Sequence, residues 1–167
     1  LVQFDITIPG GHLLDPEGKS GVASLLSRLM MQGTASKTPA ELEEAIGLIG
    51  ASINMYSANE DFHITGSCLS KHFDETIALV KEIILEPRWD AKEFKRIKKA
   101  LETRLKGAEA NPNSIASTAY NKLLYGDEHI FSTSGSGTQE SIKEITIEDL
   151  KGYYNALSTS NTKLHIA

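Results

Sequence analysis

This 167-residue sequence is short of cysteine, of aromatic residues and of long apolar runs. Its single cysteine, Cys68, excludes an internal disulfide framework. No apolar run approaches the length of a membrane-spanning helix, so no membrane span is expected. Basic residues are outnumbered, 17 Lys and Arg against 22 Asp and Glu, and the one basic stretch, 92–106, holds a single aromatic residue, Phe94. The sequence therefore indicates no nucleic-acid partner, and the basic stretch is interpreted as a solvated helix face.

The chain is large enough to bury one hydrophobic core, since 40% of its residues are hydrophobic. We therefore expect residues 1–167 to form a single domain. Leu1 already lies inside a strand pattern, and Ala167 ends inside another. These two observations favour a piece excised from a longer, multi-domain chain.

Hydrophobic periodicity predicts an α+β fold. Alternating apolar and polar residues predict strands over 2–8, 52–57, 62–69 and 162–167, of which the second and third form a hairpin. Apolar residues three and four positions apart predict helices over 18–33, 38–50 and 71–86. The same spacing predicts three more helices: one from Asp90 to Asn111, one from Asn111 to Gly126, and one from Thr146 through Tyr154. Because hairpin strands are separated by groups of helices, we expect a mainly antiparallel sheet with helices packed on one face.

Helix start signals support this assignment. Three predicted helices open with a capping box, in which the first residue and the third residue after it each bond the other's backbone N–H. The pairs are Thr38 with Glu41, Asp90 with Glu93, and Thr146 with Asp149.

The segment Gly21–Thr34 carries the most informative pattern. It reads Gly-Val-Ala-Ser-Leu-Leu-Ser-Arg-Leu-Met-Met-Gln-Gly-Thr, with an apolar stripe from Val22 to Met30. Its frame of Gly-x-Ala, an apolar pair and a later Gly-Thr resembles the active-site helix of the insulinase, pitrilysin and mitochondrial-processing-peptidase family of zinc metallopeptidases. In that family the frame carries the inverted zinc motif His-x-x-Glu-His.

The resemblance continues in order along nearly the whole chain. The opening strand with the turn at Asp15-Pro16, the capped helix over 38–50, and the following hairpin are similar to successive family elements. Three later segments are also similar to family elements: Leu85-Glu86-Pro87, the stretch from Tyr125 to Tyr154, and the closing strand over 161–167. The resemblance implies the family's α/β roll, one unit of a larger protein in which two or four units close around peptide substrates and commonly only one keeps zinc.

The resemblance also locates the lost motif. The first His falls on Ser24, the Glu on Ser27 and the second His on Arg28, while Glu102 lies near the place of the family's third ligand. Two hydroxyls and a permanent cation cannot hold Zn²⁺. We therefore expect no catalytic, cofactor-binding or metal-binding residue in this domain, Glu102 being a possible remnant, and we expect zinc in a companion domain.

Other candidate residues have ordinary interpretations. Ser24 and Arg28 lie off the apolar stripe and are expected on the solvent side, although Arg28 could instead bind peptide carboxylates or carbonyls. The histidines lack the i, i+4 spacing of a metal site, and neither serine of the motif lies on a nucleophile turn. Cys68 is expected to be a buried, inert thiol. The Gly/Ser segment 132–137 is either a flexible connector or a lid.

Two functions remain open at this point. The first is a non-catalytic domain of a zinc metalloendopeptidase, a scaffold and chamber wall for a zinc-bearing domain in the same chain or in a partner subunit. The alternative is a purely structural or assembly subunit of the same fold. The expected partners are homologous peptidase domains and a peptide substrate, in a soluble protein of the bacterial cell envelope or the cytoplasm.

Overall fold

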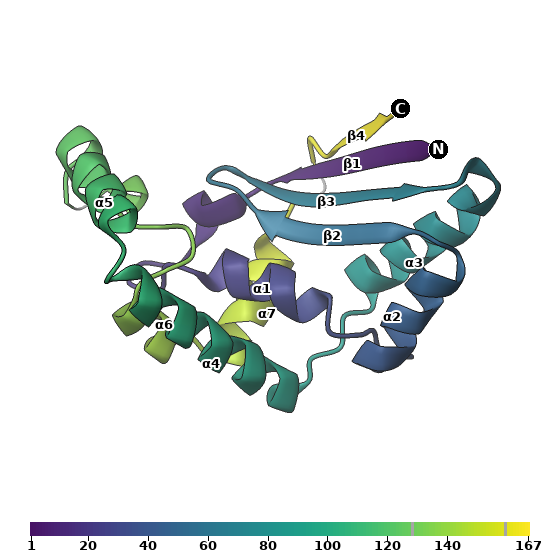
Figure 1. Ribbon diagram of the computed structural model, residues 1–167, viewed down its shortest axis with the longest axis horizontal. Coiled ribbons are helices and arrows are strands. Elements are labelled where there is room, and N and C mark those ends of the chain that lie inside the picture. The colour runs from purple at the N-terminus through teal and green to yellow at the C-terminus, as the bar shows by residue number, and fades with distance from the viewer. Residues whose placement is uncertain (128, 159) are drawn as a thin grey trace.

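The computed structural model describes residues 1–127, 129–158 and 160–167, and its centre is a four-stranded antiparallel sheet. The strands are β1 (Val2–Pro9), β2 (Ser52–Ser57), β3 (Asp61–Cys68) and β4 (Lys163–Ile166), in the order β2-β3-β1-β4. The helices lie below one face of this sheet, and the two termini lie together at one end of it (Figure 1). The predicted α+β class is confirmed.

The helix-facing side of the sheet is apolar. Phe62 and Ile64 of β3 are buried there, as is Cys68, which confirms the expected burial of the thiol. Phe4 of β1 pairs with Gly66, and its ring occupies the space that a side chain at position 66 would need. A glycine is required at that point because the ring packs directly on the backbone.

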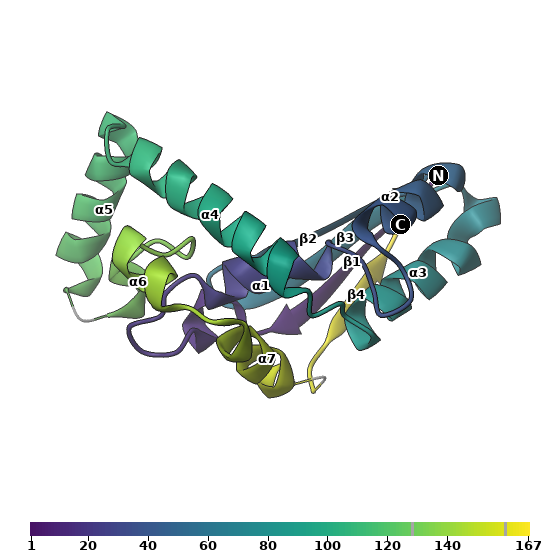
Figure 2. The same cartoon turned by 90° about the horizontal axis from the view of Figure 1, so that it is seen from below.

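Seven α-helices are present in the described ranges. They are α1 (Val22–Met30), α2 (Pro39–Leu48), α3 (Phe73–Leu85), α4 (Ala91–Ala108), α5 (Pro112–Tyr125), α6 (Gln139–Glu144) and α7 (Ile147–Ala156). Three short helical turns accompany them, at Gly11–Leu14, Ser70–His72 and Ile130–Ser132. Helix α1 is central: it contacts β2, α4 and α7 (Figures 1 and 2).

Helix α1 is shorter than the segment 18–33 predicted from periodicity. Gly21 precedes it with φ 105°, and Gly33 follows it with φ 103°. Both are left-handed conformations that only glycine adopts at low cost, so each interrupts the helical backbone. The apolar stripe correctly predicted the buried residues of α1 but not the residues at which the helix begins and ends.

Helix capping agrees with the sequence at two of the three predicted boxes. Thr38 with Glu41 and Thr146 with Asp149 form reciprocal boxes. Asp90 caps α4 alone, because the Glu93 carboxylate pairs with Arg96 at 2.7 Å instead of returning to the cap. A fourth box, Thr138 with Ser141, opens α6, a helix that the periodicity analysis missed because it is only six residues long.

Helix α5 stands apart from the body. It leaves α4 at Asn111-Pro112 and projects beyond the end of the sheet (Figures 1 and 2). None of its residues is buried, and Leu123 is 88% exposed. No helix among residues 1–127, 129–158 and 160–167 combines the length and the apolar character needed to cross a bilayer.

Candidate functional site

The face of α1 that carries the degenerate motif is more enclosed than its sequence suggests. Ser24 is 7% exposed and Ser27 is 3% exposed, so the expectation that position 24 lies on the solvent side is wrong. Since α1 lies between the sheet and helices α4 and α7, its polar side is covered as well as its apolar stripe. The Ser27 hydroxyl donates to the Ser24 carbonyl at 3.0 Å.

Arg28 is the one residue of α1 that is exposed. Its guanidinium takes part in no ion pair among the described residues. Partial desolvation lowers the pKa of Arg28, and the nearby positive charge of Arg104 on α4 lowers it further. The charge of Arg104 on α4 therefore acts on the side chain at the position where the family frame places a zinc ligand.

The helical register of α4 determines which of its residues approach α1. Arg96 donates to Gln32, two residues after the end of α1, and Arg104 lies a little more than two helical turns further along α4. Lys98 points elsewhere, because its ammonium reaches the carbonyls of Lys143 and Ile145 at 2.8 and 2.7 Å.

Glu102 is one turn beyond Lys98 on α4, so the two residues are neighbours on the surface of that helix. The residue of α4 that acts on Arg28 is Arg104, whose charge lowers the pKa of Arg28. Glu102 as a remnant zinc ligand stays a prediction, and the sequence analysis placed Arg104 only on the solvated face of the basic stretch.

The segment that follows α5 supports Arg104. The Arg104 guanidinium donates to the Ser136 hydroxyl at 3.0 Å, and the Ser136 backbone lies directly against Gly21. The same segment is tied to the turn before α1, because Thr133 and Ser20 share a hydroxyl hydrogen bond of 2.9 Å and Ser141 donates to the Ser20 carbonyl at 2.7 Å. The predicted Gly/Ser connector is thus held against the start of α1 by specific hydrogen bonds.

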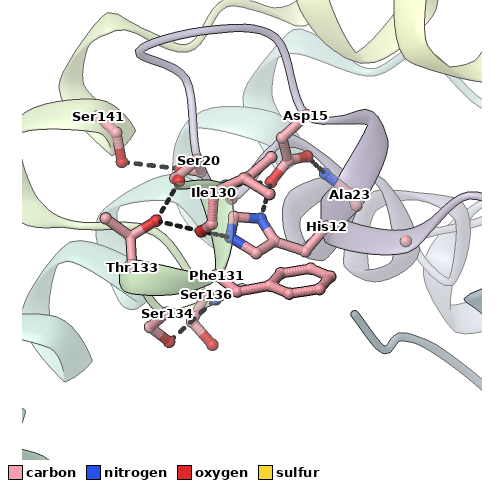
Figure 3. Close-up of polar contacts among 12 residues, drawn as sticks. His12, Asp15, Ser20, Ala23, Ile130, Phe131, Thr133, Ser134, Ser136 and Ser141 are labelled. Atoms are coloured by element: carbon pink, nitrogen blue, oxygen red, sulfur yellow. Dashed lines mark hydrogen bonds and ion pairs between the residues drawn. The ribbon is translucent and has the colours of Figure 1, made fainter. Parts of the chain in front are cut away.

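A buried pair, His12 and Asp15, fixes the N-terminal end of α1 (Figure 3). The Asp15 carboxylate accepts from the backbone N–H groups of Gly21 and Ala23 at 2.7 and 2.8 Å. It also accepts from His12 Nδ1 at 2.7 Å, while His12 Nε2 lies 2.9 Å from the Ile130 carbonyl. Gly21 is the N-cap residue of α1 and has no side chain, so the Asp15 carboxylate caps the helix in its place.

His12 is not available to a metal. Both of its ring nitrogens lie within hydrogen-bond distance of protein oxygens, so both are already engaged within the protein. Sequence reasoning did not single out this pair, although the spacing His-x-x-Asp before a glycine turn was a usable signal. Its role became visible only when Ile130, more than a hundred residues away, was brought to the ring.

Two of the other histidines, His63 and His72, have separate partners. His63 lies 3.2 Å from Asp5 and stacks on Tyr56, and His72 pairs with Glu75 at 2.8 Å. Within the described ranges no three His, Cys, Asp or Glu side chains gather as they would around a metal ion. The donors at the motif positions, two serine hydroxyls and the nearby guanidinium groups, do not fit Zn²⁺.

A second polar cluster fixes the chain after α1. Glu82 of α3 accepts from Thr34 at 2.5 Å, from Ser36, and from Lys37 at 2.6 Å. These hydrogen bonds lower the pKa of Glu82 to about 2, the Lys37 bond contributing most. Both ends of the motif helix are therefore anchored by a carboxylate.

Comparison with known proteins agrees with this geometry. A non-peptidase homolog, YmxG, from Helicobacter pylori is 25% identical over 142 residues, covering 85% of this chain and 33% of its own length. An uncharacterized zinc protease, YmxG, from Bacillus subtilis is 22% identical over 152 residues, covering 91% of this chain and 37% of its own length.

A solved structure has the same fold. The peptidase M16 inactive domain from Pseudomonas fluorescens superposes with a TM-score of 0.91 at 21% identity, over 99% of this chain and 40% of that one. This chain spans about a third of the length of the two curated relatives. Residues 2–134 match the family described as Insulinase (Peptidase family M16). With most of its length inside that match, the chain belongs to the insulinase family of peptidases, and it does so without the family's zinc motif.

Proposed function

We propose that this chain is a non-catalytic domain of a zinc metalloendopeptidase. It forms part of the wall of a substrate chamber and supports a zinc-bearing domain elsewhere in the same chain or in a partner subunit. The observation that carries this proposal is the motif helix itself. Its packing and both of its anchors are intact, whereas the residues at the ligand positions, Ser24, Ser27 and Arg28, cannot hold zinc.

The surface of α5 supports a contact with a companion domain. Its large apolar residues are exposed, with Tyr120 at 64% and Leu123 at 88%. An exposed apolar surface of this kind is typical of an interaction site. The coverage of the relatives is in keeping with this, because about two thirds of each curated relative lies outside the match.

The second candidate is a structural or assembly subunit with no part in proteolysis. One observation favours it: the Helicobacter pylori relative is described as a non-peptidase homolog. The two candidates differ in whether peptide reaches the face of this domain that carries Arg28.

Site-directed photo-crosslinking in the full-length protein tests the proposal. A photoreactive amino acid replaces Arg28 in one variant and Asn54 in another, since Asn54 is an exposed residue on the sheet face away from the helices. We expect chelator-sensitive cleavage of unfolded peptides by the full-length protein, and crosslinks to peptide from position 28 but not from position 54. Cleavage without a crosslink at position 28 would contradict the chamber role. Absence of both zinc and cleavage would favour the structural subunit.

A further inference from the structure

We propose that the outward side of helix α5 is a docking surface for a further domain of the same polypeptide, whose matching surface is apolar and uncharged. The outward side consists of six apolar residues: Ile115, Ala116, Ala119, Tyr120, Leu123 and Leu124. This inference rests on the proposed function and deepens it, because it gives the contact with the companion domain a defined face and assigns that domain to the same chain.

The first observation is that α5 turns a polar side toward its own domain. Ser114 and Asn121 are the two residues of α5 that are half-buried, and Tyr125 follows four residues later. Residues seven and eleven positions apart lie almost in line along a helix, so these three residues share one side of α5. The ring centroid of Tyr125 lies 5.7 Å from that of Phe131, which belongs to the helical turn that α5 contacts most.

The apolar residues of α5 lie on the opposite side. They form two adjacent rows with a spacing of four residues, and the line between the rows lies opposite Ser114. An amphipathic helix of a globular protein normally buries its apolar side, whereas α5 exposes it. The exposed fractions are 55% for Ile115, 64% for Tyr120, 88% for Leu123 and 57% for Leu124.

The outward side of α5 is also uncharged. The sequence gives α5 a single charged residue, Lys122, whose ammonium lies 3.6 Å from the Asp127 carboxylate, whereas charged residues make up half of α4. The core of a protein interface is depleted of charge and enriched in aromatic residues such as Tyr. A lipid surface fits less well, because helices that lie on membranes carry many Lys and Arg residues on their polar side.

Helix α5 is held at both ends, so its outward side is preformed. At its start, the Asn111 side chain accepts hydrogen bonds from two backbone N–H groups of the first turn. At its end, the Tyr125 ring stacks on His129 with centroids 5.4 Å apart, and the nearby Phe131 ring has its centroid 6.4 Å from that of the buried His12 (Figure 3). A surface that is already ordered loses little conformational freedom when it binds.

The size of this surface favours a domain of the same chain over a separate partner. Helix α5 has 14 residues and is about 21 Å long, so one of its sides offers far less than the roughly 800 Å² per partner that a standard interface buries. A covalently linked domain needs less area, because the linkage keeps it at a high effective concentration. The relatives have chain for such a domain: the match covers 33% of the Helicobacter pylori protein and 40% of the Pseudomonas fluorescens structure.

Thiol protection in the full-length protein tests the docking surface. One cysteine replaces Leu123 on the outward side, and the control replaces Thr118, which is exposed on the side of Ser114. Cys68 is buried, and cysteines outside residues 1–167 are changed to serine. We expect a maleimide to react at least about tenfold more slowly with Leu123→Cys than with Thr118→Cys at every protein concentration, since a covered thiol reacts only when the contact opens. Equal rates would overturn the proposal, and protection that is lost on dilution would replace it with a contact between two chains.

Photo-crosslinking identifies the occupant. A photoreactive amino acid at Tyr120 should form crosslinks within one polypeptide, to residues outside 1–167, and the same group at Thr118 should not. Crosslinks from position 120 to a second polypeptide, or to lipid, would overturn the assignment to the same chain. Protection and internal crosslinks without chelator-sensitive cleavage would count against the proposed function alone. Cleavage without protection at position 123 would count against the docking surface alone.

Discussion

The polar side chains at the two ends of helix α1 differ in burial and in pairing. At its start, Asp15 and His12 are buried, and their charges and donors are fully used within the protein. Near its end, Arg28 is exposed, the charge of Arg104 lowers its pKa, and it has no acidic partner in the described ranges. The first arrangement stabilises the helix, whereas the second supplies no ion pair among the described residues.

The difference shows which part of the inherited site this chain has kept. The elements that hold the motif helix in place are intact, because the fold needs them whether or not a metal is bound. The fold makes no such demand on the ligand positions, and two of them, Ser24 and Ser27, are buried hydroxyl residues rather than apolar ones.

The largest effect is expected at the buried end. Asp15→Asn should lower the free energy of unfolding by about 3 kcal/mol, because it removes a buried charge that accepts from two backbone N–H groups and from His12. Chemical denaturation measures the change. Glu75→Gln is the matched control, since Glu75 pairs with His72 at the same spacing on the surface, and it should cost less than about 0.5 kcal/mol. Equal losses in the two variants would mean that burial does not separate them.

Restoring the zinc motif tests the end of α1 that carries Arg28. The variant Ser24→His, Ser27→Glu and Arg28→His should bind zinc weakly, because Arg104 remains beside the site. Adding Arg104→Glu should raise zinc affinity about a hundredfold, since it removes a cation and supplies a third ligand. Competition with a zinc-binding dye measures both constants. If the triple variant binds as tightly as the fourfold one, and Glu102→Gln weakens it, then Glu102 is the third ligand.

The Glu82 cluster gives a pH-dependent prediction for the loop that follows α1. The pKa of Glu82 is lowered to about 2, so its contribution is complete above the unfolded value near 4.5 and is lost as the pH falls toward about 2. Glu82→Gln should remove about 2 kcal/mol at pH 7 and progressively less below pH 4.5. Thermal unfolding from pH 7 to pH 3 tests this. A loss that does not change with pH would show that the hydrogen bonds, not the charge, provide the stability.

The smallest effect should have the opposite sign. Arg28→Gln should raise the free energy of unfolding by about 0.3 kcal/mol, because it relieves repulsion with Arg104. The gain should shrink in high salt, which screens exposed charges. A destabilised Arg28→Gln protein would mean that Arg28 has a structural partner, and the comparison between the two ends of α1 would fail.

The sequence by itself determined the fold class, the positions of the strands and the loss of the zinc motif. These follow from local properties: alternating apolar residues in β1 and β3, capping pairs such as Thr38 with Glu41, and the chemical identity of Ser24, Ser27 and Arg28. Each can be seen within one short segment, so no knowledge of the rest of the chain is needed.

Only the tertiary structure decided what surrounds the motif helix. Periodicity identified the apolar side of α1, but α4 and α7 cover its other side and bury Ser24. The electrostatic effect of Arg104 on Arg28 depends on how α4 packs against α1, and the role of His12 depends on Ile130. These relationships join residues from about 75 to 118 positions apart. Local periodicity contains no information on such distances, because packing between elements sets them.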